Sequence, residues 1–284
     1  MEQLLAGKNV FITGAGANIG RAIALEMAEQ GANIYFAEID AARSAALEQE
    51  LQANGTTTQG FVCDVSRATT IEDILQQLNQ RQVAIDILVN NVGITDVPRE
   101  ATLQSFETWQ QVMDTNVLGP LYLSRIVAQN MIDRGTAGSI LFITSVHQWV
   151  YHGSEVYSAT KAGLGMIIDE LAVLLAQHNI RVNGIAPGSC IEAPDGLPIR
   201  NNGTPLYHES VKPCYIGRAA VFLSSDYFSR HTTGAVLKID GGLSLYAFNN
   251  RDIICPPVTP SFPRARRLAR RGLNYLGKIR RLSE

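Results

Sequence analysis

Three side chains near the middle of the chain have the types and spacing needed to move a proton on a substrate oxygen. Tyr157 and Lys161 lie four residues apart in a helical pattern over residues 155–178, which predicts that both point to one side of a helix. A phenol has a pKa of about 10, and a neighbouring ammonium favours the phenolate and brings that pKa toward neutrality. Ser145 follows the apolar run 139–144 and could hydrogen-bond the same oxygen. Taken alone, the Tyr-x-x-x-Lys pair also fits an ordinary amphipathic helix with a solvated lysine.

A glycine-rich turn near the amino terminus has the properties of a phosphate-binding loop. The apolar run 9–13 predicts a buried strand, residues 21–30 predict a helix, and the turn between them contains Gly14, Gly16, Asn18, Ile19 and Gly20. Glycines let backbone N–H groups approach a ligand, and a helix N-terminus attracts negative charge. The Gly-x-Gly-x-x-x-Gly spacing differs from both the common G-x-G-x-x-G fingerprint and the P-loop. The order strand, turn, helix favours a dinucleotide site over a flexible turn.

An acid after the second predicted strand bears on the choice of cofactor. Glu38 follows the apolar run 33–37 and lies eighteen residues after Gly20. A carboxylate near this distance accepts hydrogen bonds from an adenosine ribose and repels a 2′-phosphate. Glu38 therefore favours NAD over NADP; the alternative is an ordinary solvated loop acid, and Asp40 is the nearest rival.

The rest of the chain alternates apolar strand-like runs with amphipathic helical stretches. This alternation predicts an α/β fold with a doubly wound parallel sheet, in which ligands bind at the carboxyl ends of the strands. Asp64 and Asn90 fall at such ends. Asn116 lies in an apolar helical stretch, where we expect its amide either to tie down the helix or to serve the site. Further strands are expected near residues 57–63, 85–89, 139–144, 181–186 and 234–242, and helices near 42–53, 69–80, 105–134, 155–178 and 215–223.

Composition excludes several classes of protein. The chain has 284 residues, is 46% hydrophobic and carries a net charge of -2, which suits a large core and gives no sign of nucleic-acid binding. No apolar run approaches the roughly 20 residues of a membrane span, and the amino terminus lacks a signal-peptide pattern, so we expect a cytoplasmic protein. The four cysteines show no C-x-x-C spacing, which argues against a zinc site and against disulfides. We expect no metal.

Two segments depart from the strand and helix pattern. Residues 189–213 are rich in Pro, Gly and Asn and are well placed to act as a lid. From residue 249 the composition changes, so we divide the chain into a domain of residues 1–248 and a tail of residues 249–284, with a proline-containing linker and a basic stretch. Within the tail, residues 264–282 could form a basic amphipathic helix. It would contact an anionic membrane surface or an acidic partner, or else be a solvated tail.

Together these motifs resemble the short-chain dehydrogenase/reductase family over residues 5–245. The resemblance rests on the glycine turn, Asp64, Asn90 to Gly93, Asn116, Ser145, the Tyr157/Lys161 pair, Pro187-Gly188 and Asp240-Gly241-Gly242, in the family's order and approximate spacing. It implies a seven-stranded Rossmann domain that binds NAD(H) or NADP(H). It also implies a catalytic tetrad of Asn116, Ser145, Tyr157 and Lys161. The cofactor-binding positions it implies are Gly14, Gly16, Asn18, Ile19, Gly20, Glu38, Asp64, Val65, Asn91, Val92, Gly93, Tyr157, Lys161, Pro187 and Gly188.

The resemblance assigns roles, and the chain departs from the family at three places. By likeness, Lys161 also contacts the nicotinamide ribose, Asp64 meets the adenine, and Asn116 supports a water in a proton relay. Asn18 replaces the middle glycine of the turn, and because Asn tolerates a positive φ better than most residues, the turn can keep its shape. Val92 replaces a small alanine. Ser189 stands where a nicotinamide-binding threonine commonly follows Pro187-Gly188.

The motifs predict an NAD-dependent oxidoreductase that interconverts a secondary alcohol and a ketone. The alternatives are a 3-oxoacyl thioester reductase of the same fold, which usually prefers NADPH, and a catalytically idle nucleotide-binding scaffold that recruits partners through its tail. A sugar-nucleotide epimerase is disfavoured, because the glycine spacing typical of such enzymes differs from the spacing in this chain. His147, Trp149 and Tyr151 follow Ser145 and either line a substrate pocket or belong to a surface loop. The expected partners are a small-molecule alcohol or carbonyl substrate and, by family likeness, further copies in a homodimer or homotetramer.

Overall fold

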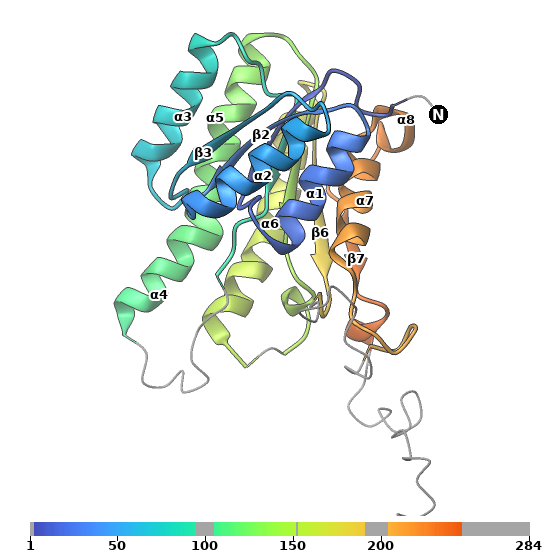
Figure 1. Ribbon diagram of the computed structural model, residues 1–284. Coiled ribbons are helices and arrows are strands. Elements are labelled where there is room, and N and C mark those ends of the chain that lie inside the picture. Colours follow the sequence, from blue (N-terminus) through green and yellow to red (C-terminus); the bar gives the residue numbers. More distant parts are fainter. Residues whose placement is uncertain (1–2, 95–104, 152, 191–203, 246–284) are drawn as a thin grey trace, which may run out of the picture. The chain divides into compact units, whose positions relative to one another are not determined.

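Seven parallel strands form one sheet that positions the candidate site. The computed structural model describes residues 3–94, 105–151, 153–190 and 204–245 (Figure 1). The strands lie in the order β3-β2-β1-β4-β5-β6-β7, and each adjacent pair is parallel. The order reverses between β1 and β4, so a ligand-binding crevice is expected outside the carboxyl ends of these two strands. The bounds are β1 Asn9–Thr13, β2 Asn33–Glu38, β3 Thr58–Val62, β4 Ile87–Asn90, β5 Gly138–Ile143, β6 Ile180–Pro187 and β7 Val236–Ile239.

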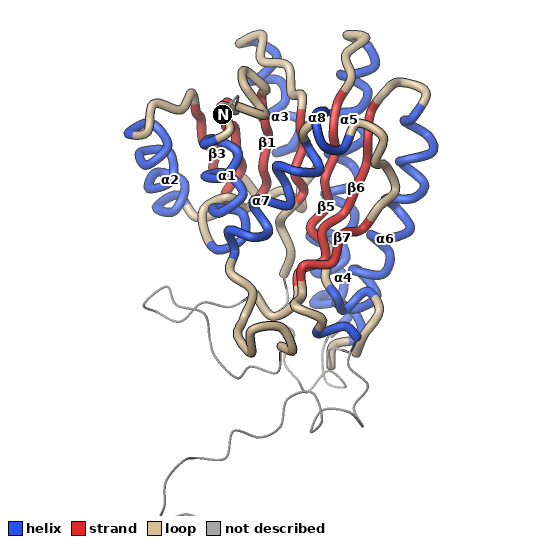
Figure 2. Tube along the Cα trace, turned by 90° about the vertical axis from the view of Figure 1, so that its right-hand side faces the viewer, coloured by secondary structure: helices blue, strands red, loops and turns tan. Residues whose placement is uncertain are grey.

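Helices cover both faces of the sheet, as the two views in Figures 1 and 2 show. One layer consists of α1 Asn18–Glu29, α2 Ala41–Ala53 and α7 Pro213–Ser224, and the other of α3 Ala68–Gln80, α5 Gly119–Asp133 and α6 Glu155–Ala176. A short helix, α4 (Phe106–Met113), comes before α5 in the chain, and another, α8 (Asp226–Ser229), comes after α7. A 3-10 turn, η3 (Val146–Gln148), follows β5.

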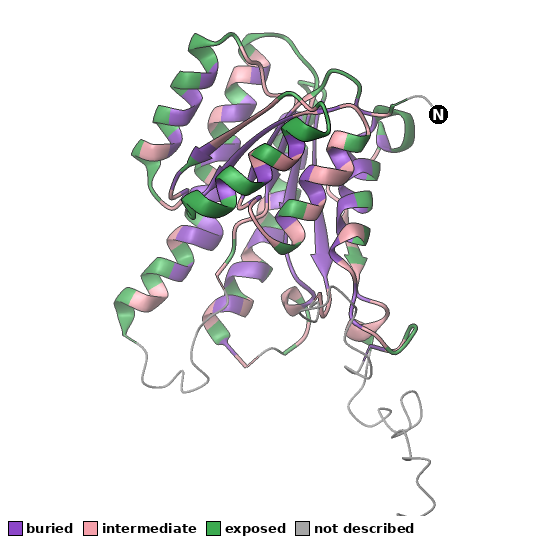
Figure 3. Cartoon of the chain, viewed as in Figure 1, coloured by how far each residue is buried: buried purple, intermediate pink, exposed green. Residues whose placement is uncertain are grey.

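Each helix layer has its own hydrophobic core against the sheet. In β1, Phe11 belongs to the core under α3, α5 and α6, whereas Val10 and Ile12 belong to the core under α1, α2 and α7. Successive strand side chains point to opposite faces, and both faces are covered, which is why the strands read as nearly continuous apolar runs. In Figure 3 most of the sheet is buried, and the helices show one buried and one exposed side.

The predicted α/β fold with a seven-stranded parallel sheet flanked by helices is confirmed. The predicted helical stretch over residues 105–134 is present as α4, a π-helical turn, η2 (Asp114–Leu118), and α5; the π-helical turn within it was not predicted. The first helix begins at Asn18, three residues before the predicted start. The boundary at residue 248, the tail 249–284 and residues 191–203 of the predicted lid lie outside the described residues. Within the described ranges, no helix has the length and apolarity that a membrane span requires.

A buried arginine joins the sheet to the end of α7. The guanidinium of Arg181, on β6, donates to the carbonyl oxygens of Leu223 at 2.5 Å and Ser224 at 3.0 Å, and to Ser229 Oγ at 3.1 Å. It also pairs with Asp226 at 3.3 Å. The last carbonyls of a helix have no partners within the helix, so this guanidinium satisfies them and stabilises the negative end of the helix dipole.

We expect Arg181→Met to lower the free energy of unfolding by roughly 2 to 4 kcal/mol, because helix carbonyls and a buried hydroxyl lose their donor. Urea denaturation followed by circular dichroism measures this loss. Arg218→Met is the matched control, since Arg218 pairs with Glu26 at 3.3 Å but is largely exposed and its removal should change stability little. Equal losses in the two variants would contradict the structural role of Arg181.

Candidate active site

A cavity of about 470 Å³ lies at the carboxyl ends of β1 to β4. Its volume falls within the range of about 300 to 1,000 Å³ that is usual for cofactor sites. The predicted cofactor-binding residues Gly16, Tyr157, Lys161, Pro187 and Gly188 are not among the residues that line it. Those that do line it are Gly14, Asn18, Ile19, Gly20, Glu38, Asp64, Val65, Asn91, Val92 and Gly93.

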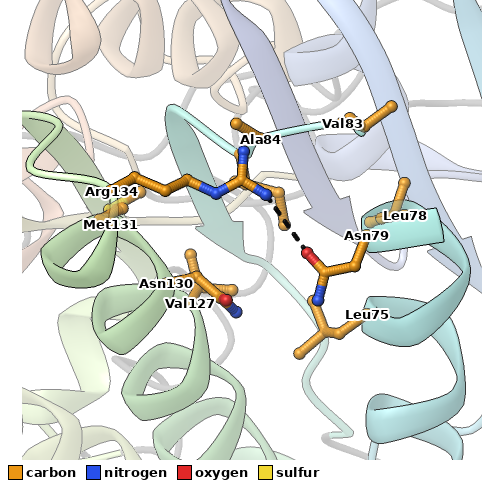
Figure 4. Close-up of a pocket in the computed structure, with 10 residues that line it drawn as sticks. Leu75, Leu78, Asn79, Val83, Ala84, Val127, Asn130, Met131 and Arg134 are labelled. Atoms are coloured by element: carbon orange, nitrogen blue, oxygen red, sulfur yellow. Dashed lines mark hydrogen bonds between the residues drawn. The ribbon is translucent and has the colours of Figure 1, made fainter. Parts of the chain in front are cut away.

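A second cavity, between α3 and α5, is far too small for a cofactor. Figure 4 shows its lining, in which Arg134 donates to Asn79 Oδ1 at 3.4 Å. Its volume is about 10 Å³, which is enough for one water molecule at most. In the part of the chain that the structure describes, no three His, Cys, Asp or Glu side chains gather where they could hold a metal ion.

The glycine turn after β1 is closed by contacts that only glycine permits. A Cβ on Gly20 would lie 2.1 Å from the carbonyl oxygen of Gly14 and 2.6 Å from Asn91 Nδ2. The Asn91 amide donates to the carbonyls of Thr13 and Gly14, both at 3.0 Å, and so joins the turn to the end of β4. Asn18 adopts a φ of +46°, which Asn tolerates, so the turn forms without the family's middle glycine.

The first turn of α1 meets this cavity without a side-chain cap. The N-cap residue is Ala17, whose side chain cannot accept a hydrogen bond, and Asn18, Ile19 and Gly20 line the cavity. The first N–H groups of a helix have no partners within the helix and attract anions. The open N–H groups, the glycine turn and the volume of the cavity together fit the pyrophosphate of a dinucleotide.

Glu38 is held at the end of β2 by two backbone groups. Its carboxylate accepts hydrogen bonds from Gly16 N at 2.8 Å and Asp40 N at 3.1 Å, and the residue is only 6% exposed. The bond to Gly16 was not predicted, and it makes the acid a part of the glycine turn. Asp40, the rival acid, instead caps α2, where its Oδ1 accepts from the N–H groups of Ala42 and Arg43.

Asp64 follows β3 on the same side of the cavity. Its Oδ1 accepts hydrogen bonds from Ser66 N at 3.0 Å and Ser66 Oγ at 2.7 Å, and its Oδ2 lies 3.6 Å from Arg67 Nε. These local bonds fix the carboxylate at the rim. The neighbouring Cys63 thiol also lines the cavity, and burial raises its pKa, so the thiol stays protonated at neutral pH.

The ammonium of Lys161 is buried beside the carboxyl end of β5. Lys161 is 3% exposed, and its Nζ donates to the carbonyl oxygen of Ile143 at 2.9 Å. Burial lowers the pKa of Lys161 to about 8. A Cβ on Gly93 would lie 3.1 Å from Nζ and 3.7 Å from Asn116 Oδ1. The bare backbone at Gly93, which lines the cavity, therefore brings the lysine and the asparagine to its edge.

Tyr157 and Ser145 lie beside this lysine. Their hydroxyl groups share a hydrogen bond, and Lys161 Nζ lies 5.7 Å from the centre of the Tyr157 ring. The prediction of a lowered pKa for Tyr157 is wrong, because the pKa is raised. Burial, which disfavours the phenolate, is the largest cause and outweighs the hydrogen bond with Ser145. The ammonium at this distance does not offset the burial.

Asn116 lies in the π-helical turn η2 and is fully buried. Its Oδ1 accepts a hydrogen bond from Ile94 N at 2.8 Å, and its Nδ2 donates to Ile94 O at 3.1 Å and to Thr160 Oγ1 at 3.2 Å. One of the two predicted roles was to tie down the helix backbone. The side chain does bind backbone groups, but they belong to the loop after β4 and not to the helix. π-Helical turns are frequent at functional sites.

The three predicted substrate-pocket residues lie in three different environments. The His147 ring lies 6.2 Å from the Tyr157 ring in an edge-to-face arrangement, and His147 N donates to Ser145 Oγ at 3.2 Å. Trp149 lies under Lys238 of β7, whose Nζ is 4.3 Å from the ring centre. Tyr151 is 92% exposed. The structure therefore brings His147 next to the catalytic candidates and directs Trp149 toward β7.

Several groups that complete the site were not predicted from the sequence. The acceptor for Lys161 is a main-chain carbonyl, that of Ile143, which leaves no trace in residue types. The hydrogen-bond partners of Asn116 likewise cannot be predicted from the sequence. Arg43 lines the cavity near Glu38 and could have been found as the basic residue in the first turn of the helix after the second strand.

The fold and the cavity define a dinucleotide-binding α/β protein. A family model described as short chain dehydrogenase matches residues 8–193. The chain belongs to the short-chain dehydrogenase/reductase family of NAD(P)-binding oxidoreductases, which supports an enzyme that acts on CH–OH donors.

Similar proteins include both dehydrogenases and reductases. Glucose 1-dehydrogenase 2 of Bacillus subtilis is 30% identical over 256 residues, which cover 87% of this chain and 98% of the relative. A 3-ketoacyl-(acyl-carrier-protein) reductase from Brucella melitensis complexed with NADH has a TM-score of 0.77 at 28% identity and covers 84% of this chain and 99% of its own. A gluconate 5-dehydrogenase from Burkholderia cenocepacia in complex with NADP and tartrate has the same TM-score and identity, with 87% and 99% covered. Both cofactors therefore occur among solved structures similar to this chain.

The buried ammonium of Lys161 should make stability depend on pH. The Lys161 pKa falls from 10.5 to about 8 on folding, so between these values the unfolded chain binds more protons and the cost of burying Lys161 declines as pH rises. From about pH 8 to about pH 9.5, we expect the unfolding free energy of the wild type to rise relative to that of Lys161→Met by roughly 1 to 2 kcal/mol. Urea denaturation measures the difference, and Lys8→Met, which removes an exposed ammonium, corrects for net charge. A difference that stays constant over this window would contradict the burial of a charged Lys161.

Proposed function

We propose that this chain is an NAD-preferring oxidoreductase that interconverts a secondary alcohol and a ketone through Ser145, Tyr157 and Lys161, with Asn116 as the fourth residue of the site. The observation that carries the proposal is the convergence of two hydroxyl groups that share a hydrogen bond with a buried ammonium beside them, at the edge of a cavity of dinucleotide size. A phenol, a hydroxyl and an ammonium are the groups that proton transfer at a substrate oxygen needs.

The chain's residues would divide the binding of the cofactor among them. The glycine turn and the open end of α1 would hold the pyrophosphate, Glu38 the adenosine ribose, and Asp64 with Val65 the adenine. Asn91, Val92 and Gly93 would border the middle of the dinucleotide, and Pro187 with Gly188 the nicotinamide. When bound, the nicotinamide supplies the acceptor or donor of a hydride.

In the direction of alcohol oxidation, the Tyr157 phenol would first release its proton to solvent, and the resulting phenolate would take the proton from the substrate hydroxyl. Ser145 would donate a hydrogen bond to the oxygen that becomes the carbonyl, and Lys161 would stabilise the phenolate during the transfer. An ammonium in a site shielded from water acts more strongly on a neighbouring charge than it does in solution. In the reverse direction, the raised pKa of Tyr157 keeps the phenol protonated and ready to donate to a ketone.

Two further features concern the substrate. His147 is the polar side chain next to Tyr157, and we propose that it contacts the substrate. Trp149 and Tyr151 follow on the same loop and would form the outer wall of the substrate pocket.

A 3-oxoacyl thioester reductase is the second candidate, because a solved structure similar to this chain is a reductase of that class. Glu38 favours the first candidate, since such reductases usually prefer NADPH. A screen of alcohols, sugars, steroids and hydroxyacyl thioesters with both cofactors separates the two.

We expect Tyr157→Phe to lower kcat by about 100-fold or more, because a general acid–base group contributes on the order of 10² to 10⁴ in rate. The measurement is nicotinamide absorbance on the best substrate from the screen. Cofactor affinity, measured by titration calorimetry, is the control and should change little, since the phenyl ring remains. Full turnover by Tyr157→Phe would refute the proposed reaction.

The tail gives a separate test of the scaffold alternative. We expect a chain that ends at residue 248 to keep its turnover, because the proposed groups all precede that residue, whereas residues 264–282 would serve contact with an anionic membrane or an acidic partner. Turnover of both chains and their sedimentation with anionic vesicles are the measurements. Loss of turnover on truncation would contradict the division into a catalytic domain and a tail.

The proposal also includes a homodimer or homotetramer and a cytoplasmic location. Light scattering tests the oligomeric state, and cell fractionation tests the location.

A further inference from the structure

The turn η3 contacts its neighbours through three consecutive side chains. His147 faces Tyr157 of α6, with 6.2 Å between the ring centres. Trp149 lies under Lys238 of β7, whose Nζ is 4.3 Å from the ring centre. Gln148, between these two residues, packs on the backbone of α6 further along the helix. The proposed reaction uses His147 and Trp149 but gives no role to Gln148.

The amide of Gln148 occupies space that only a glycine on α6 leaves open. A Cβ on Gly165 would lie 2.0 Å from Gln148 Nε2 and 2.8 Å from Gln148 Cδ, so any side chain at position 165 must displace the amide. Gly165 is buried inside α6, where glycine lowers the stability of the helix relative to alanine. The helix therefore carries a destabilising residue at the point where Gln148 packs on it.

Gly165 continues the row of catalytic candidates along α6. Tyr157, Lys161 and Gly165 follow one another at intervals of four residues, so they lie toward one side of the helix. The side of α6 that presents the phenol and the ammonium thus also presents the contact for Gln148. One helix face therefore holds two of the proposed catalytic groups and the turn that carries the third.

Hydrogen bonds within the turn link the position of Gln148 to that of Ser145. The backbone N–H of Gln148 donates to the carbonyl oxygen of Ser145 at 3.0 Å, and the N–H of His147 donates to Ser145 Oγ at 3.2 Å. The second bond uses an acceptor site of the hydroxyl and leaves its O–H group to donate. A shift of Gln148 would therefore turn the Ser145 hydroxyl away from a substrate oxygen.

The contact between Gln148 and Gly165 depends on shape. Gln148 Oε1 is buried and accepts no hydrogen bond from the residues that the structure describes. The fit of the side chain to the bare helix backbone, rather than a bond to this oxygen, keeps it in place. A side chain of similar length without an amide should fill the same space.

We propose that Gln148 is a positioning residue: by packing on Gly165 it holds η3 against α6 and fixes Ser145 and His147 relative to Tyr157. This inference rests on the proposed function, because it assumes that these groups act on the substrate. A misplacement of about 1 Å can cost a reaction on the order of 100-fold in rate. A contact remote from the reacting atoms can thus control kcat.

A double-mutant cycle tests this contact. Gly165→Ala fills the space and Gln148→Ala empties it, so each should lower kcat by about tenfold or more. The double variant should lose no more than the more impaired single variant, because the same contact is already gone. The measurement is nicotinamide absorbance on the best substrate from the screen. The Kd for NAD⁺, from titration calorimetry, should change by less than about threefold, since neither residue lines the cofactor cavity.

Hydrogen exchange read by mass spectrometry tests the same contact without turnover. The amides of residues 147–150 all donate hydrogen bonds within the turn. In both single variants they should exchange several times faster than in the wild type, and no faster still in the double variant. Exchange at wild-type rates in both single variants would overturn the inference.

Two further variants serve as controls. Gly163→Ala lies on the same helix, but a Cβ there meets no other atom within 4 Å, so it should leave kcat unchanged. Gln148→Met keeps the length of the side chain and should retain most of kcat.

Losses of kcat that multiply in the double variant would overturn the inference, and so would a Gly165→Ala variant that is less stable in urea but keeps its kcat. The latter result, together with a Tyr157→Phe variant that loses turnover, would leave the proposed function standing. Full turnover by Tyr157→Phe would overturn the proposed function itself.

Discussion

A lysine ammonium buried under a strand end is the constraint on which the site depends. A charge removed from water must keep a hydrogen-bond acceptor, and for Lys161 the structure provides the carbonyl of Ile143. That bond fixes the first turns of α6 against β5, and with them the phenol of Tyr157. It also favours a small residue at position 93, because a Cβ there would lie 3.1 Å from the ammonium. One charge thereby sets the relative positions of a helix, a strand and the loop after β4.

Much of the fold could be predicted because both faces of the sheet are covered. Strands such as β1 must then be apolar throughout, and the helices must carry one apolar side, so the two periods are visible in the residue types. The π-helical turn at Asp114–Leu118 could not be predicted, because its residues fit an α-helix equally well. Within this turn the Asn116 amide pairs with Ile94, a contact between distant parts of the chain that residue types do not show.

The candidate site divides in the same way. Side chains that could take part in catalysis, such as Ser145 and Tyr157, can be predicted from their types and spacing, and the structure brings them together. The raised pKa of Tyr157 could not be foreseen, since it comes from burial that depends on the whole fold, whereas the sequence shows only the neighbouring lysine. The bond from Gly16 to Glu38 is likewise a tertiary contact, and it changes the acid from a ribose acceptor alone into a support of the glycine turn.

The uncapped start of α1 implies a compromise between holding itself together and holding a ligand. A serine or aspartate in place of Ala17 would supply the missing acceptor and stabilise the helix, typically by about 1 kcal/mol. The same side chain would occupy the N–H groups that an incoming phosphate needs, and an aspartate would add a repelling charge. Alanine at this position therefore leaves the ligand-free protein less stable than it could be, and it keeps the N–H groups at the start of α1 available to a phosphate.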